Sequence, residues 1–202
     1  MKTLAEIKFD KIIKEGFHQL LKPLGFKKKA NNFYLQRQDL GQIINIQKSS
    51  FYSKVNINFT INTGLFLPEH WIGLTYNQGK DIPTFPTEPE CLIRKRIGGL
   101  RNQHDTWYDV NEKTDENKLI LEMQTNLVKY ILPHFDRTKT KVEFLKLLDS
   151  EKILAPLDKL IVYAELKQFD KAKTEYLTIL KEKINPYFLD TVKEYGKKYG
   201  LE

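Results

Sequence analysis

The sequence lacks the features that mark several common classes of protein. A single cysteine, Cys91, excludes an intramolecular disulfide. No stretch approaches the roughly 18 uncharged apolar residues that a membrane-spanning helix requires. The N-terminal segment becomes charged again too soon for a secretory signal, since Lys2, Glu6 and Lys8 interrupt it. These absences predict a soluble cytoplasmic protein that does not contact a membrane.

Motifs for metal binding and catalysis are also missing. The four histidines, His18, His70, His104 and His134, have neither helix-face nor zinc-finger spacing. There is no Gly-x-Ser-x-Gly elbow and no phosphate-binding Gly-x-x-x-x-Gly-Lys loop. Cys91 and His104 could form a dyad, but a cysteine at the start of a strand is usually a small buried apolar group. We therefore expect no catalytic residue, no metal, no cofactor and no enzymatic activity.

Positive charge is concentrated in the first half of the chain. The net charge is +7, and residues 1–100 hold 15 Lys and Arg against 8 Asp and Glu, which accounts for the whole surplus. Such a field can attract nucleic acid, an anionic ligand or an acidic protein surface, although solvated basic surfaces are also common. With 41% hydrophobic residues, the chain of 202 residues can bury a core.

Hydrophobic periodicity predicts a helix followed by an antiparallel sheet. Apolar residues at helical spacing indicate a helix over 4–22, which Pro23 ends. The next connections are too short for crossover helices, which favours an antiparallel meander. Its predicted strands are 26–29, 33–37, 43–48, 55–62, 91–97 and 107–110, and Gly98-Gly99 is expected to end the fifth.

The strand 55–62 alternates apolar and polar residues without a break, so its two faces differ. We expect the apolar face to be buried against the first helix, and the other face to be wet or to line a polar groove. The expected contacts are Val55, Ile57, Phe59 and Ile61 on the strand with Phe9, Ile13, Phe17 and Leu20 on the helix. The opposite face carries Asn56, Asn58, Thr60 and Asn62.

The remaining sequence predicts a loop and then helices. Residues 63–90 contain four prolines and read as a long surface loop, which in compact domains is often functional. Helical patterns follow at 115–133, 138–148, 157–166, 169–182 and 187–199. The fold class is therefore α+β, with an N-terminal helix on an antiparallel meander and a C-terminal helical segment. We place an α+β domain at 1–135 and a helical extension at 136–202.

A candidate binding surface consists of polar side chains on neighbouring strands. Arg94 and Arg96 are two residues apart, so they project from the same face of a strand. Arginine and amide groups can bind carboxylates, phosphates or exposed backbone, and a neighbouring aromatic ring also suits single-stranded nucleic acid. The alternative is an ordinary solvent-facing surface. The candidate residues are Gln47, Asn58, Asn62, Arg94, Arg96 and Trp107.

An ordered set of short segments resembles a bacterial family, domain of unknown function 4304, over roughly residues 5–135. The segments are Gly25–Lys29, Asn32–Tyr34, Ile46–Ser49, Asn58–Asn62, Arg94–Gly98 and Trp107-Tyr108. The family often has two tryptophans at the last position, so Tyr108 is a mild departure. The resemblance implies a small α+β bacterial domain without transferable catalytic residues. Relatives of this kind often lie beside interbacterial toxin genes, which implies a protein-binding or immunity role.

The expected function is therefore that of a non-enzymatic protein-binding domain. Its expected partner is another protein, in particular a bacterial toxin that it neutralises. The alternative is a nucleic-acid-binding protein that uses the basic N-terminal half.

Overall fold

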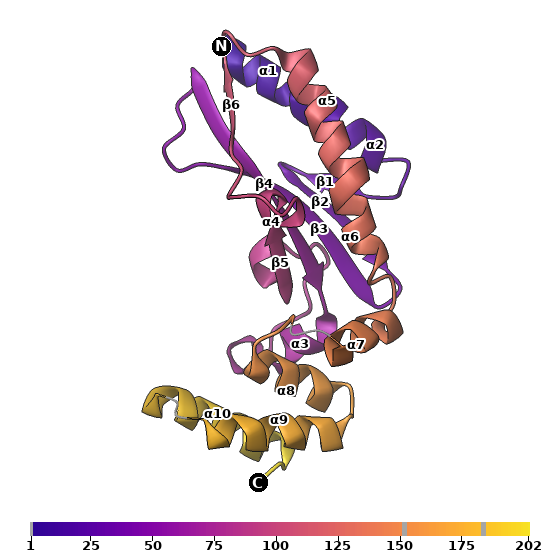
Figure 1. Cartoon of the computed structure of the whole chain (residues 1–202), viewed down its shortest axis with the longest axis vertical. Helices are drawn as coiled ribbons and strands as arrows, with labels where there is room; N and C mark the ends of the chain where they lie inside the picture. The colour runs from indigo at the N-terminus through magenta and orange to yellow at the C-terminus, as the bar shows by residue number, and fades with distance from the viewer. Residues whose placement is uncertain (1, 151–152, 183–184) are drawn as a thin grey trace. The chain divides into compact units, whose positions relative to one another are not determined.

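A computed structural model describes residues 2–150, 153–182 and 185–202. The chain forms two compact units that are interleaved in sequence (Figure 1). The first comprises Met1–Phe66 and Phe85–Glu143, and the second Leu67–Thr84 and Phe144–Glu202. The segment 67–84 thus leaves the first unit and returns to it. The domain boundary at residue 135 stays a prediction.

The first unit begins with the predicted amphipathic helix, which the structure divides into three parts. The side chain of Thr3 caps its N-terminus in a capping box with Glu6. After α1 (Leu4–Ile13), the π-helical segment η1 (Lys14–His18) leads into the short helix α2 (Gln19–Leu21). The buried side chains on this helix are Ala5, Phe9, Ile12, Ile13, Phe17 and Leu21.

Six antiparallel strands form the sheet of the first unit (Figure 1). They run in the order β1-β2-β3-β4-β5, and β6 pairs with the same edge of β4 as β5 does, but at the start of that strand. The predicted antiparallel α+β fold is therefore confirmed. The strands are β1 (Lys27–Lys29), β2 (Asn32–Arg37), β3 (Leu40–Lys48), β4 (Asn56–Phe66), β5 (Ile93–Arg96) and β6 (Tyr108–Asn111).

One face of the sheet packs against the first helix through aromatic residues. Phe9 and Phe59 meet edge to face, with ring centroids 5.4 Å apart, and Ile57 and Ile61 are fully buried on the same face. Three of the four predicted strand residues are therefore in the core. The fourth, Val55, is 67% exposed, because β4 begins only at Asn56 and the alternation extends into the preceding loop.

Leu20 was predicted to face the sheet, but it is exposed and Leu21 is buried instead. The π-helical segment explains the difference. It contains more residues per turn than an α-helix, so residues after it are rotated relative to an unbroken 3.6-residue pattern. A correct apolar period therefore assigned the wrong leucine to the core.

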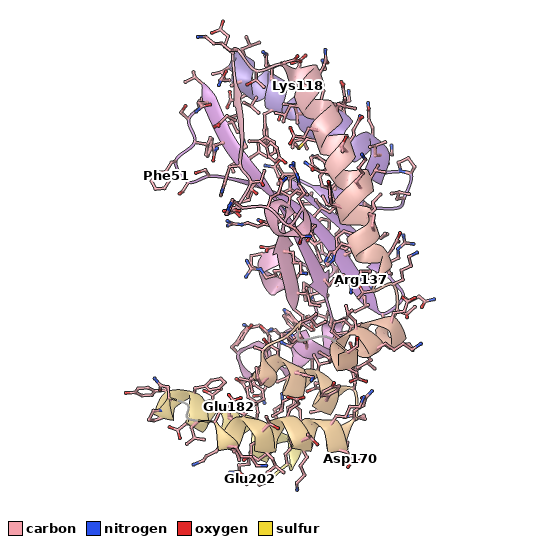
Figure 2. The ribbon with its side chains drawn as sticks, in the orientation of Figure 1. Phe51, Lys118, Arg137, Asp170, Glu182 and Glu202 are labelled. Atoms are coloured by element: carbon pink, nitrogen blue, oxygen red, sulfur yellow. The ribbon has the colours of Figure 1, made fainter. Side chains whose placement is uncertain are left out.

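A second long helix of the first unit also contains a π-helical segment. It consists of α5 (Glu116–Asn126), η4 (Leu127–Ile131) and α6 (Leu132–Asp136), with Asp115 as its N-cap. We predicted that it would end near Pro133, but it continues to Asp136. Pro133 is the second residue of α6, directly after the π-helical segment, and the helix continues through it to its C-cap, Arg137 (Figure 2).

Two further segments differ from the sequence-based prediction. Residues 63–66 belong to β4, which is longer than the alternating pattern, and 67–84 contain the helix α3 (Pro68–Gly73) and the 3₁₀ turn η2 (Thr75–Asn77). Gly98 and Gly99 lie inside the short helix α4 (Ile97–Leu100). A second 3₁₀ turn, η3 (Glu88–Glu90), precedes β5. The proline-rich stretch is thus partly helical.

The second unit consists of packed helices close to the predicted spans. Around Gly73 of α3 the packing against α8 is tight, because a β-carbon there would overlap Ile161. The hairpin of α8 and α9 is joined by an ion pair of 2.8 Å between Lys159 and Glu175. Most of α7 (Lys141–Ser150) belongs to this unit. The other helices are α8 (Pro156–Glu165), α9 (Phe169–Lys181) and α10 (Pro186–Tyr199).

Candidate functional site

The strand register places the predicted polar residues on one face of the sheet. Directly opposite residues of antiparallel strands share a face, and Arg96 pairs with Asn62 while Arg94 pairs with Gly64. Gln47 pairs with Thr60, which is two residues from both Asn58 and Asn62 on β4. This surface, here called the polar face, lies opposite the face that carries Phe59. The structure therefore brings the predicted strand residues together on one side.

Amide side chains form a hydrogen-bonded network across the polar face. Asn45 Nδ2 donates to Asn32 Oδ1 at 2.7 Å, and Asn62 Nδ2 donates to Gln47 Oε1 at 2.7 Å. A longer bond of 3.2 Å joins Asn62 to Asn45. The network spans β2, β3 and β4, and Asn62 at its centre is only 3% exposed. These bonds hold the amides in place and explain why asparagine is tolerated in the strands.

Arg94 is paired with an acidic residue of the segment that precedes its strand. Its guanidinium donates from Nε to Glu88 Oε1 at 2.7 Å and from Nη2 to Glu88 Oε2 at 3.0 Å. This bidentate bond raises the pKa of Arg94. Because Glu88 is buried, the arginine serves to neutralise an internal carboxylate.

Arg96 belongs to a cluster of three side chains at the edge of the polar face. Its Nη1 donates to Asp105 Oδ2 at 2.6 Å, and Trp107 Nε1 donates to the same oxygen at 3.0 Å. The guanidinium also lies over the Trp107 ring, 5.5 Å from its centroid. We call these three residues the Arg96–Asp105–Trp107 cluster. Its carboxylate orients both the cation and the indole.

The two arginines do not converge on a shared space. Each is bound to its own carboxylate, Glu88 or Asp105, both from segments next to β5 in the first unit. An anion-binding site formed by the arginine pair is therefore disfavoured. Asn58 is similarly engaged, since its Nδ2 donates to Asp109 Oδ1 at 3.0 Å. The polar face offers oriented amides and an aromatic ring rather than an unpaired positive charge.

Sequence reasoning missed the part of the polar face contributed by β1 and β2. Lys29 pairs with Asn32, and Asn32 pairs with Asn45, so a row of polar residues crosses the sheet to Asn62 and Arg96. The run of lysines from 27 to 29 is the one signal in this hairpin that indicated a polar surface. The register that aligns Asn32 with Asn45, Asn62 and Arg96 depends on how the strands pair in the folded protein, so no local sequence pattern predicts it.

The proposed nucleophile Cys91 lies in an environment that suppresses reactivity. It is buried, its Sγ contacts Thr87 O at 3.5 Å, and it packs against Gly64 of β4. Burial, with a smaller contribution from Glu88, raises the pKa of the thiol, which disfavours the thiolate. His104 lies in the exposed loop after α4. These surroundings favour a structural role for Cys91.

Neither a metal-binding cluster nor a membrane-spanning helix is present in the part of the chain that the structure describes. Among residues 2–150, 153–182 and 185–202, no group of three or more His, Cys, Asp or Glu is arranged to hold a metal ion. Over the same residues, no helix is both long enough and apolar enough to cross a bilayer.

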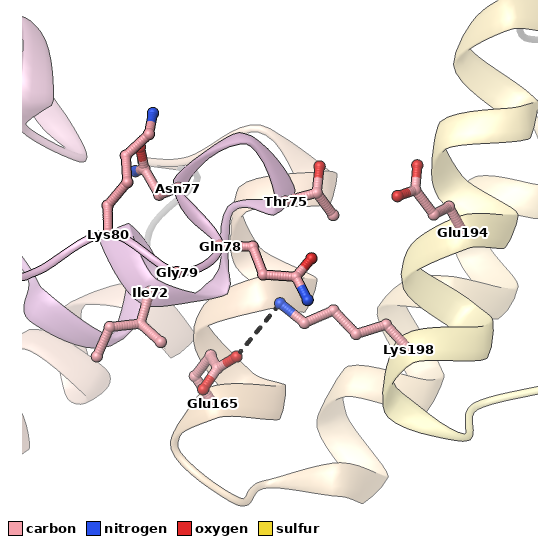
Figure 3. Close-up of a pocket in the computed structure, with 9 residues that line it drawn as sticks. All are labelled: Ile72, Thr75, Asn77, Gln78, Gly79, Lys80, Glu165, Glu194 and Lys198. Atoms are coloured by element: carbon pink, nitrogen blue, oxygen red, sulfur yellow. Dashed lines mark ion pairs between the residues drawn. The ribbon is translucent and has the colours of Figure 1, made fainter.

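The second unit contains a polar cleft of about 410 Å³ beside η2, α8 and α10 (Figure 3). Lys198 Nζ donates to Gly73 O at 2.5 Å and lies 3.7 Å from Glu165 Oε1. Tyr199 OH donates to the same glutamate oxygen at 2.8 Å, and burial together with this bond raises the pKa of Tyr199. Gln78 also lines the cleft. These contacts engage Lys198 and Glu165, two of the four charged residues that line the cleft.

Comparison with known proteins yields one match. The model of the family described as Domain of unknown function (DUF4304) matches residues 17–137, which is more than half of the chain. Neither a curated protein nor a solved structure matches the sequence. The matched span runs from η1 to the end of α6 and includes all six strands and the polar face.

Proposed function

The chain belongs to the DUF4304 family, and we propose that it is a non-enzymatic protein-binding domain that contacts its partner through the polar face. The observation that carries this proposal is the Arg96–Asp105–Trp107 cluster beside a fixed network of amides. Tryptophan and arginine are the residues most often found at the energetic centres of protein interfaces. Amides can bond to backbone N–H and C=O groups of a partner.

The pairing of the arginines supports a protein partner over nucleic acid at this face. Phosphate binding relies on cations that can replace counterions along the backbone. Arg94 and Arg96 already bind Glu88 and Asp105, so an incoming phosphate would compete with a fixed carboxylate. A mixed surface of amides, ion pairs and one indole is better matched by another protein.

We further propose an immunity-type role, in which the partner is a bacterial toxin that this protein neutralises in the cytoplasm. The support comes from the family resemblance and its association with toxin genes, together with a surface suited to protein contact. This part of the proposal is narrower than protein binding and can fail separately. Co-expression with toxic domains encoded near the gene tests it, because neutralisation restores growth.

Co-purification from the native host, followed by substitution of Trp107, tests the binding proposal. We expect a tagged protein to retain a partner in mild salt, and Trp107→Ala to weaken binding by at least about tenfold, as at an interface hot spot. Tyr187→Ala is the matched control, because Tyr187 is 85% exposed on α10 of the second unit. Equal loss in both variants, or no specific protein partner, would contradict the proposal.

A further inference from the structure

The surplus positive charge of the chain is concentrated around the edge strand β1. Residues 16–68 contain seven Lys and Arg and one acidic residue, Asp39. Three of these lysines form β1, which is the last strand at one end of the main strand order, and a fourth ends the helix that precedes it. They are Lys22, Lys27, Lys28 and Lys29, all exposed, and we call them the β1 lysines.

The β1 lysines differ from the arginines at the other end of the sheet in how they are paired. Within the described parts of the chain, none of the four forms an ion pair with a carboxylate, whereas Arg94 and Arg96 each do. Lys28 instead lies over the Phe33 ring, 5.9 Å from its centroid. The positive charge at β1 is therefore available to an external partner, while the two arginines of β5 are neutralised internally.

The register connects the β1 lysines to the polar face. Lys29 pairs with Asn32, at the start of the polar row that ends at Arg96, and Lys27 pairs with Tyr34 on the same face. With strands about 4.8 Å apart, the four intervals from Lys29 to Arg96 span about 19 Å. A partner that covers the polar face would thus meet neutralised charge at one end and unpaired positive charge at the other.

We propose that the β1 edge binds an acidic, extended segment of a partner protein. This inference rests on the proposed protein-binding function and adds the chemistry of the partner. An edge strand presents unpaired backbone N–H and C=O groups, to which an extended segment can add as a further strand. Carboxylates on alternate residues of that segment would face Lys27 and Lys29, which are about 7 Å apart along β1.

Two alternatives are less consistent with the structure. Lysine on an edge strand also blocks aggregation, but that role does not account for a whole segment, 16–38, without an acidic residue. Single-stranded nucleic acid would need exposed aromatic rings on which bases stack. The rings nearest β1, Phe33 and Tyr34, are buried. The half-buried Trp107 lies beside the paired Arg96, at the opposite end of the polar row from β1.

Binding of two anionic probes to the full chain tests the inference. The probes are a fluorescein-labelled oligoglutamate of about 15 residues and an oligothymidylate of the same length, both in about 50 mM salt, where screening is weak. We expect the oligoglutamate to bind more tightly than the oligothymidylate. The double substitution Lys27→Glu with Lys29→Glu should weaken its binding by at least about tenfold, because two attractive charges become repulsive.

The matched control is Lys173→Glu with Lys181→Glu, which changes the net charge equally on the exposed surface of α9. Equal weakening in the control would show that net charge alone attracts the probe, and would overturn the inference. Tighter binding of the oligothymidylate than of the oligoglutamate would indicate a nucleic-acid partner and would also overturn the inference. The inference would be wrong as well if the oligoglutamate did not bind. Lys27→Gln with Lys29→Gln, checked by circular dichroism, should weaken binding in a folded protein, and unchanged binding would count against the site.

The two proposals can fail separately. If the β1 variants bind the native partner normally while Trp107→Ala does not, the acidic-segment inference is wrong and the polar-face proposal stands. If Trp107→Ala has no effect but the β1 variants lose both the oligoglutamate and the partner, the interface lies at β1 instead.

Discussion

Gly16 and Met123 lie so close that a β-carbon on Gly16 would be 2.8 Å from the β-carbon of Met123. This approach joins the π-helical segment η1 to helix α5. Beside it, Gln124 Nε2 donates to Glu15 O at 3.1 Å and so satisfies a backbone carbonyl within the π-helical segment. The missing side chain at Gly16 and the amide of Gln124 together allow the two helices that cover the sheet to cross at short range.

We predict that Gly16→Ala destabilises the first unit, because the added methyl group meets a β-carbon that cannot move without its helix. The expected cost is about 1–3 kcal/mol of unfolding free energy, as for other overpacked sites. Gly99→Ala is the control, since a β-carbon at Gly99 would meet nothing within 4 Å. Urea unfolding of both variants provides the measurement. Equal stabilities would mean that the helix crossing tolerates a wider spacing.

Phe59 should contribute strongly to the free energy of folding. It is fully buried between Phe9 and Tyr108, so Phe59→Ala removes two ring contacts and leaves a cavity. We expect a loss of about 3–5 kcal/mol, whereas Val55→Ala at an exposed site should change stability by less than about 0.5 kcal/mol. Denaturant midpoints of the two variants test this. A loss below about 1 kcal/mol for Phe59→Ala would contradict the assigned core face.

The bond between Arg94 and Glu88 should be structural. Arg94→Ala leaves the buried Glu88 carboxylate without its bidentate donor, and we expect a cost of about 1–3 kcal/mol. Adding Glu88→Gln should recover part of that cost, because a neutral amide is easier to bury than an unpaired carboxylate. A double-mutant cycle measures the coupling. Strictly additive effects would show that the pair contributes little.

His134 should make stability depend on pH. Burial, with repulsion from Lys95 and Arg137, lowers its pKa from 6.5 to about 4. Between pH 6.5 and about 4, the unfolded chain therefore binds a proton at His134 more readily than the folded protein does. The contribution of the neutral histidine to the free energy of unfolding is complete above pH 6.5 and is lost as the pH falls toward 4. We expect about 1–3 kcal/mol less stability at the acidic end of this window.

Urea unfolding of the wild type and of His134→Gln, at pH 6.5 and at about pH 4, isolates the contribution of His134 to the pH dependence of stability. The variant should show a smaller decrease in stability on acidification than the wild type. The same decrease in both proteins would assign the pH dependence to other groups. An increase in wild-type stability on acidification would contradict the direction of the pKa shift.

Local patterns were sufficient to predict the longer helices, the strands and one face of the sheet. The helix before Pro23, the short hairpin connections and the alternation from Ile57 to Ile61 each express a preference that acts over a few residues. The same patterns failed where an element departs from its ideal period or length. Leu20 is an example, because no propensity rule indicates a π-helical turn. Val55 is another, because strand ends depend on pairing partners.

The sequence by itself determined that this is an α+β chain with a basic first half, since composition and periodicity are local and additive properties. Only the tertiary structure decided how that charge can act. The pairing of Arg94 with Glu88 and of Arg96 with Asp105 depends on loops that return to the sheet. The register then aligns Lys29 with the amides and leaves the β1 lysines without carboxylate partners among the described residues. Charge is encoded along the chain, but its neutralisation requires groups brought together by folding.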